Sequence, residues 1–114
     1  MAATNADKIE IAEFIASRGD KITAHEGDPG TNGANQIGSS SGNTTWGAGV
    51  IVGNDAVVTG SPIPFSIPAG KTVSHFGVWN GATFRRGYAL DASITVGSTG
   101  PAPVDITPKI KYTG

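Results

Sequence analysis

The chain has 114 residues, a mass of 11.5 kDa and a formal charge of −1 at pH 7, from eight Lys and Arg against nine Asp and Glu. This balance lacks the basic excess of nucleic-acid-binding proteins. The sequence has no apolar run of about 20 residues that could span a membrane, and the lack of cysteine excludes disulfides and thiolate chemistry.

A helix is predicted over residues 5–18, after an N-terminal arm of residues 1–4 in which we expect no secretory signal. Thr4 or Asn5 can cap it, and Gly19 is suited to a left-handed stop at its end. Apolar residues at i, i+3 and i+4 predict a narrow stripe that docks on a sheet: Ile11, Phe14 and Ile15.

After the helix, short β-type segments recur every eight to twelve residues, with turn formers between them. The strands are predicted at 22–25, 44–46, 49–52, 56–59, 72–79, 83–85, 88–90, 93–96 and 106–112, and the proline-rich stretch 62–68 is predicted to be an edge strand or a bulged one. In 72–79, alternation places Val73 with His75 on one face and Phe76 with Val78 on the other, and the Asn-Gly that follows is a strong hairpin signal.

The expected fold is therefore mainly β: a single antiparallel β-sandwich or small barrel-like domain over 1–114, with the N-terminal helix packed on it. Its strands lie within 22–112, and a long Gly-rich loop occupies 26–45. Charged residues make up only 15% of the chain, and a weakly charged surface is poorly protected against association. We expect other proteins to cover part of it.

Three side chains that could hold a metal or move protons lie close together: His25, Glu26 and Asp28. They lack the alternating oxygen ligands and distant Glu of a calcium loop, so an Asp28 that caps its own turn is favoured. The glycine clusters lack phosphate-loop spacing, and the serines and His75 lack the context of a catalytic triad. The sequence predicts no enzyme, no catalytic residue, no metal, no cofactor and no small-molecule substrate.

Aromatic and basic residues leave two alternatives open. Arg85 and Arg86, between two aromatic residues, could contact single-stranded nucleic acid, but a surface ion pair or a subunit contact is favoured. Trp46 and Trp79 are expected in the core, with an exposed sugar-stacking platform as the alternative.

Two blocks of sequence resemble a known family. Residues 22–37, ITAHEGDPGTNGANQI, resemble the LHTADPGTTGANEV stretch of small virion proteins from tailed phages of actinobacteria. Residues 63–84, which begin IPFSIPAGKTVSHFGVW, are similar to that family's V.F.VPAGTTVTHVGLW block, and 44–46 resembles its Trp-containing segment. The resemblance covers about residues 5–90, follows the family loosely over 47–60, and does not extend to the C-terminal stretch.

The resemblance implies a non-enzymatic structural protein of a tailed bacteriophage virion, made in the host cytoplasm and located on the capsid or tail exterior. The chain lacks a coiled coil or a shaft repeat, which favours a capsid decoration protein on the head over a minor tail or tail-fibre protein. A carbohydrate or host-surface binding module is a third hypothesis. The expected partners are the major capsid protein or tail proteins and copies of the chain itself, without nucleic acid or membrane.

The contacts with neighbouring subunits are expected from the arm 1–4 and the charge-free loop 29–49. The candidate interface residues are Asp28, Pro29, Asn32, Trp46, Arg85 and Arg86.

Overall fold

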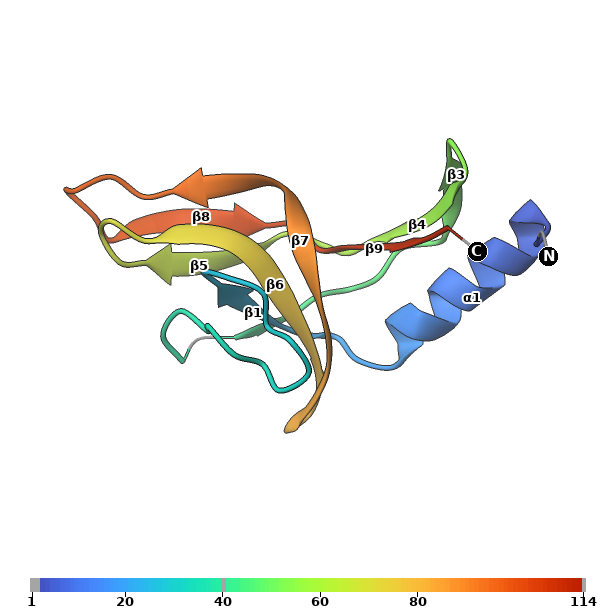
Figure 1. Cartoon of the computed structure of the whole chain (residues 1–114), viewed down its shortest axis with the longest axis horizontal. Coiled ribbons are helices and arrows are strands. Elements are labelled where there is room, and N and C mark those ends of the chain that lie inside the picture. Colours follow the sequence, from blue (N-terminus) through green and yellow to red (C-terminus); the bar gives the residue numbers. More distant parts are fainter. Residues whose placement is uncertain (1–2, 40, 114) are drawn as a thin grey trace.

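Antiparallel strands make up most of the molecule, and a helix lies at one end (Figure 1). The computed structural model describes residues 3–39 and 41–113. The elements in chain order are α1 (Asn5–Ser17), β1 (Lys21–His25), β2 (Gly42–Asn43), β3 (Val50–Val52), β4 (Asp55–Thr59), β5 (Ile63–Ile67), β6 (Thr72–Asn80), β7 (Thr83–Thr95), β8 (Ala102–Ile106) and β9 (Lys109–Tyr112). The predicted class, mainly β with an N-terminal helix packed on antiparallel sheets, is confirmed.

The strands form sheets of four (β2-β1-β6-β7), three (β3-β4-β9) and two (β5-β8). The two smaller sheets belong to one bent ribbon, because β4 leads into β5 and β8 leads into β9. At the bend, the Gly60 N–H donates to the Pro108 carbonyl oxygen at 2.8 Å. The ribbon therefore extends along the molecule, whose principal extents are 48 × 29 × 23 Å.

The larger hydrophobic core lies between the four-stranded sheet and β5-β8. In β5 the burial alternates: Ile63, Phe65 and Ile67 point inward, and Pro64 and Ser66 are exposed. The remaining buried members are Ile22, Ala24, Ile37, Val73, Phe76, Val78, Val96, Val104 and Ile106. Proline is tolerated in β5 because β5 belongs to a two-stranded sheet and is therefore an edge strand.

The outer face of β1 and β6 is also covered, by a segment that we call the covering loop (residues 26–36). A Cβ added at Gly87 would lie 2.6 Å from Pro29, and one at Gly33 would lie 2.7 Å from the Trp79 ring. Ile37 then returns to β1, where its N–H donates to the Ala24 carbonyl at 2.8 Å. The loop is thus a third layer packed on the sheet, and the expected contact of residues 29–49 with neighbouring subunits stays a prediction.

Several strands differ from the prediction. A β-bulge between Val73 and His75 shifts the alternation, so Val73 is buried on the same side as Phe76 and Val78. The three short segments predicted over 83–96 form one continuous β7, because β6 pairs with it along most of its length.

The C-terminal segment and the Trp46 segment also differ from the prediction. The single strand expected over 106–112 is two strands, β8 and β9, separated at Pro108. Trp46 makes only an isolated bridge with Gly60. The Asn80–Gly81 hairpin is confirmed: Asn80 pairs with Thr83, and Gly81 has φ +59°.

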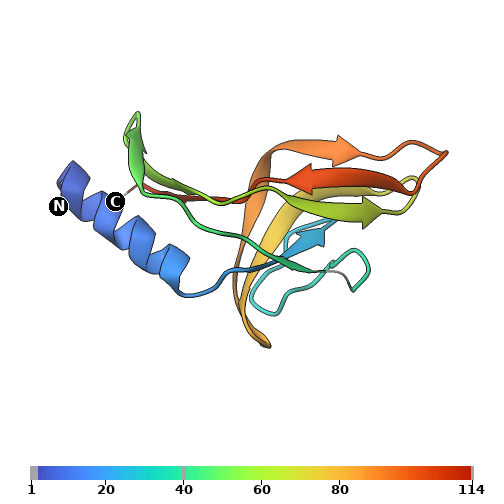
Figure 2. The ribbon, with the colours of Figure 1, turned by 180° about the vertical axis from the view of Figure 1, so that it is seen from behind.

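A smaller core lies beneath α1, in the part of the molecule that we call the helix lobe (α1, β3, β4 and β9). Figure 2 shows α1 beside β4 and β9, at the end of the molecule away from β5 and β8. Its buried residues are Ala12, Ala16, Ala56, Val58 and Ile110. Thr4 caps the helix, accepting a hydrogen bond from the Asp7 N–H at 3.1 Å.

The predicted docking stripe of α1 is wrong for Phe14, whereas Ile15 packs against the smaller core as predicted. Phe14 is 65% exposed, and the helix packs through Ala12 and Ala16, with Ile9 and Ile15 at the sides. Small side chains allow the helix axis to approach the sheet closely, so the larger Phe14 is left on the opposite face. Of the predicted arm 1–4, residues 1 and 2 lie outside the described residues, and Thr4 is the helix cap.

We expect Ala12→Leu to destabilise the fold by about 1–3 kcal/mol, because it overpacks a site with no free surface. Phe14→Ala should change the free energy of unfolding by less than about 0.5 kcal/mol. Urea unfolding in dilute solution measures both variants. The opposite ranking would mean that α1 docks through Phe14, as the sequence suggested.

Candidate functional site

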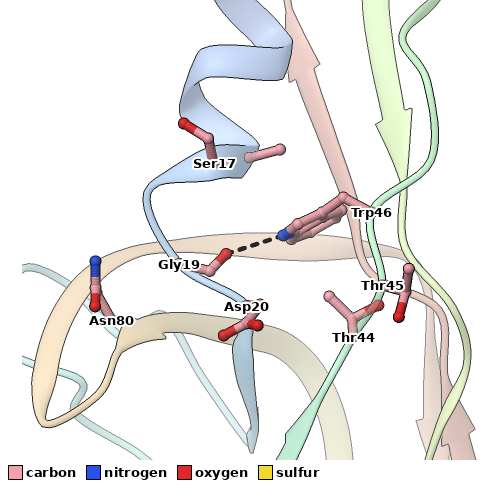
Figure 3. A pocket seen from close by; sticks show the side chains of 8 residues that line it. Ser17, Gly19, Asp20, Thr44, Thr45, Trp46 and Asn80 are labelled. Atoms are coloured by element: carbon pink, nitrogen blue, oxygen red, sulfur yellow. Dashed lines mark hydrogen bonds between the residues drawn. The ribbon is translucent and has the colours of Figure 1, made fainter.

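A cleft of about 420 Å³ opens where the end of α1 meets β1 and the hairpin of β6 and β7 (Figure 3). Its walls come from segments far apart in sequence. The lining residues are Ala16, Ser17, Gly19, Asp20, Thr44, Thr45, Trp46 and Asn80.

Trp46 is the only aromatic residue among those that line the cleft, and its ring is held in place. Its indole Nε1 donates to the Gly19 carbonyl oxygen at 2.9 Å, and its body packs against both hydrophobic cores. Gly19 is not in the left-handed region that the sequence suggested. Its lack of a side chain is needed for another reason: a Cβ there would lie 2.6 Å from the Trp79 carbonyl oxygen.

Polar groups surround Trp46 in the cleft. Asp20 and Asn80 are exposed; in Figure 3, Asp20 lies below the indole and Asn80 lies on the other side of Gly19. Thr44 is buried and donates through Oγ1 to the Ser61 carbonyl at 2.9 Å. An aromatic ring beside a carboxylate and an amide can bind a hydroxyl-rich ligand through stacking and hydrogen bonds.

The three side chains considered for a metal are separated by the fold. His25 is fully buried, Glu26 pairs with Lys71 at 3.0 Å, and Asp28 accepts a hydrogen bond from the Gly30 N–H at 2.9 Å. Asp28 thus caps its own turn, as expected. Among residues 3–39 and 41–113, no group of three or more His, Cys, Asp or Glu is arranged to hold a metal ion.

His25 takes part in a buried hydrogen-bond network that fixes the covering loop. Its Nδ1 lies 2.7 Å from the Ala34 carbonyl oxygen, and its Nε2 lies 2.6 Å from Thr23 Oγ1, which accepts from Trp79 Nε1 at 2.9 Å. A carbonyl oxygen only accepts, so Nδ1 carries the proton and the Thr23 hydroxyl donates to Nε2. A Cβ added at Gly77 would lie 2.7 Å from His25 Nε2 and 2.7 Å from Thr23 Oγ1.

Burial lowers the pKa of His25 below its ordinary value of 6.5, and the nearby His75 acts in the same direction, against the hydrogen bond to Ala34. The neutral ring forms hydrogen bonds with both the Ala34 carbonyl and the Thr23 hydroxyl, which is consistent with a lowered pKa. His25 is therefore a structural residue of the covering loop.

The covering loop packs on β7 next to Arg85 and Arg86, so five of the six candidate interface residues lie in one region and only Trp46 lies elsewhere. Asp28 and Asn32 are exposed on the covering loop, Arg85 and Arg86 are exposed on β7, and Trp46 lies in the cleft. Pro29 is fully buried against Gly87 and has no free surface to offer a neighbour. Arg86 Nη1 donates to the Tyr88 hydroxyl at 3.2 Å. The interface role of the five that have exposed surface stays a prediction.

Two features were missed at the level of sequence. Asp20 and Asn80 were interpreted only as a charge and a turn residue, and nothing in the sequence indicates that they line the same cleft as Trp46. Asp91 pairs with Lys109 at 3.0 Å and with Lys111 at 2.9 Å, and these hydrogen bonds and charges lower its pKa to about 2. The i, i+2 spacing of the lysines, which places both on one face of β9, was the available signal.

No protein-family model matches the chain, and neither a curated protein nor a solved structure is significantly similar to it. The resemblance to phage virion proteins therefore stays a prediction. In the part of the chain that the structure describes, no helix is long and apolar enough to cross a membrane.

The His25 network predicts that stability falls as the pH is lowered from about 6.5. The folded state has the lower pKa, so the contribution of the neutral ring is complete above pH 6.5 and is lost as the pH falls towards the folded-state pKa. Urea unfolding of the His75→Gln variant between pH 8 and pH 5 isolates His25, because the contribution of Asp91 is lost only below about pH 4. A flat profile between pH 7.5 and pH 5 would contradict this assignment.

Proposed function

We propose that this chain is a non-enzymatic structural subunit of a tailed-phage virion, located on the head exterior as a capsid decoration protein. The resemblance supports this proposal, and in the fold the two similar blocks of sequence pack against each other. β1, from the first similar block, pairs along its whole length with β6, from the second, and the covering loop of the first block packs over β6. The resembling residues therefore form one structural unit.

The observation that carries the proposal is the position of the exposed apolar side chains. Phe14, Val50 and Val52 are 65%, 53% and 60% exposed, and all three lie in the helix lobe. Val50 and Val52 lie on the same face of an edge strand, and Val50 is paired with Val57 of β4. Neighbouring exposed apolar side chains such as Val50 and Val52 are typical of a protein–protein contact.

A minor tail position is the alternative within the same class, and copy number separates the two. A decoration protein occupies the head as a repeated array, whereas a minor tail protein is present in a few copies. A small contact surface at one end of an elongated subunit is compatible with either role.

We expect the purified protein to co-sediment saturably, in many copies, with heads purified from a phage that lacks this gene. The double variant Val50→Asp, Val52→Asp should lose this binding, because it places charge in an apolar contact. Ile94→Asp is the matched control, since Ile94 is also exposed but lies on β7, outside the helix lobe.

Binding to tails alone would assign the minor tail role. Binding to neither heads nor tails would contradict the virion proposal. Equal loss of binding in the control variant would show that the helix lobe is not the contact.

The cleft at Trp46 favours a second candidate function, a carbohydrate-binding module. Sugar rings stack their apolar faces on an indole while neighbouring carboxylates and amides bind the hydroxyl groups. Trp46, Asp20 and Asn80 supply these groups together, and the hydrogen bond from Trp46 to Gly19 fixes the ring before a ligand arrives.

If the cleft binds host-wall glycan fragments, titration should shift the NMR signal of the Trp46 indole N–H. The Asp20→Ala, Asn80→Ala variant removes two hydrogen-bonding groups, and we expect it to bind about tenfold or more weakly. Asp105→Ala, an exposed acid on β8, is the control. An indole signal that does not move at millimolar glycan would exclude this candidate.

A further inference from the structure

The outer face of α1 has no cover within the described part of the chain. It is formed by Asp7, Ile11, Phe14 and Arg18, whose spacings of four, three and four residues place them in one row. Phe14 is 65% exposed, Asp7 and Arg18 are exposed, and Ile11 is partly exposed. This row lies opposite Ala12 and Ala16, which pack on the sheet, so it faces away from the sheet.

The charges on this face follow a self-complementary order. An acid, Asp7, lies near the N-terminal end, a base, Arg18, lies at the C-terminal end, and the two apolar residues lie between them. The Arg18 guanidinium lies over the Phe14 ring, 5.9 Å from its centroid. The ion pairs of the structure involve other residues: Glu26, Lys71, Asp91, Lys109 and Lys111.

We propose that two copies of this chain associate through the outer face of α1, with the two helices antiparallel about a twofold axis. The centre of the row lies midway between Ile11 and Phe14, so the twofold places Ile11 of one copy against Phe14 of the other. The same operation places Asp7 of each copy against Arg18 of the other. An isologous contact requires this kind of self-complementarity.

The size of the surface determines the strength of the contact. A helix of 13 residues is only about 20 Å long, so one pair buries less than the 1,200–2,000 Å² typical of stable interfaces. The dimer is therefore weak in free solution. On a particle, many such contacts between neighbouring subunits act together. This biological role rests on the proposed virion function, whereas the dimer itself does not.

Sedimentation equilibrium of the full chain from about 10 μM to 1 mM tests the proposal. The weight-average mass should rise from the monomer value of 11.5 kDa towards that of the dimer. Phe14→Ala should raise the dissociation constant about tenfold or more, because it removes the aromatic centre of the contact twice per dimer. Ile94→Ala, which truncates an exposed isoleucine on β7, outside the helix lobe, should leave the dissociation constant unchanged.

Charge reversal gives a sharper test. Asp7→Arg and Arg18→Asp should each weaken self-association, since each places like charges together. An equimolar mixture of the two variants should dimerise again, because both pairs in the mixed dimer become opposite in sign. A variant that merely misfolds would not be rescued by mixing, and circular dichroism confirms that each variant is folded.

A wild-type chain that is monomeric at 1 mM, or charge variants that dimerise like the wild type, would overturn the inference. So would a mixture that stays monomeric. These outcomes are separate from those for the virion role. A monomeric chain that binds heads would contradict only the dimer proposal, and a dimeric chain that binds no particle would contradict only the virion proposal.

Discussion

The bent ribbon of β4-β5 and β8-β9 is the constraint on which the rest of the structure depends. One end supplies a wall of the larger core, and the other end supplies the surface on which α1 packs. Pairing is maintained through the bend by the bond from Gly60 to Pro108. A Cβ at Gly60 would collide with Thr44 and lie 2.9 Å from Pro108, so the bend accommodates only glycine at this position.

Two aromatic residues connect the two hydrophobic cores. Trp46 and Tyr88 each pack against both cores, and Tyr88 also stacks on Phe76 with ring centroids 5.6 Å apart. Because Trp46 is bonded to Gly19 at the end of α1, it ties the helix to the ribbon. The cleft beside Trp46 is thus a consequence of how the helix lobe joins the sandwich, and its shape depends on both cores.

Local signals predicted individual turns well, because a turn depends on neighbouring residues alone. The Asn80–Gly81 hairpin and the Asp28 turn are examples. Burial was harder to predict wherever it depends on distant segments. Thr23 and His25 are polar and alternate with apolar residues, which suggests an exposed face, yet the covering loop buries them. No pattern in β1 itself contains that information.

The helix was misread for a related reason. Hydrophobic periodicity weights large side chains, so Phe14 determined the predicted face, while the two alanines that pack against the ribbon carried little weight. The cleft was missed because Asp20, Trp46 and Asn80 come from three separate segments. The error on the helix bears on function, since Phe14 was assigned to the core by its periodicity but is exposed and can contact another chain.

The two parts of the molecule differ in how completely their side chains are paired or buried. In the sandwich, the buried Thr23 bonds to His25 and to Trp79, and the covering loop supplies the Ala34 carbonyl oxygen to His25. No buried side-chain N or O atom of the described residues lacks a hydrogen bond. In the helix lobe, Phe14, Val50 and Val52 remain in water. The free energy still available from burial is therefore concentrated at one end, on two faces set apart by the sheet. A subunit with two such faces can contact a surface with one and its neighbour with the other, which is the requirement for forming an array.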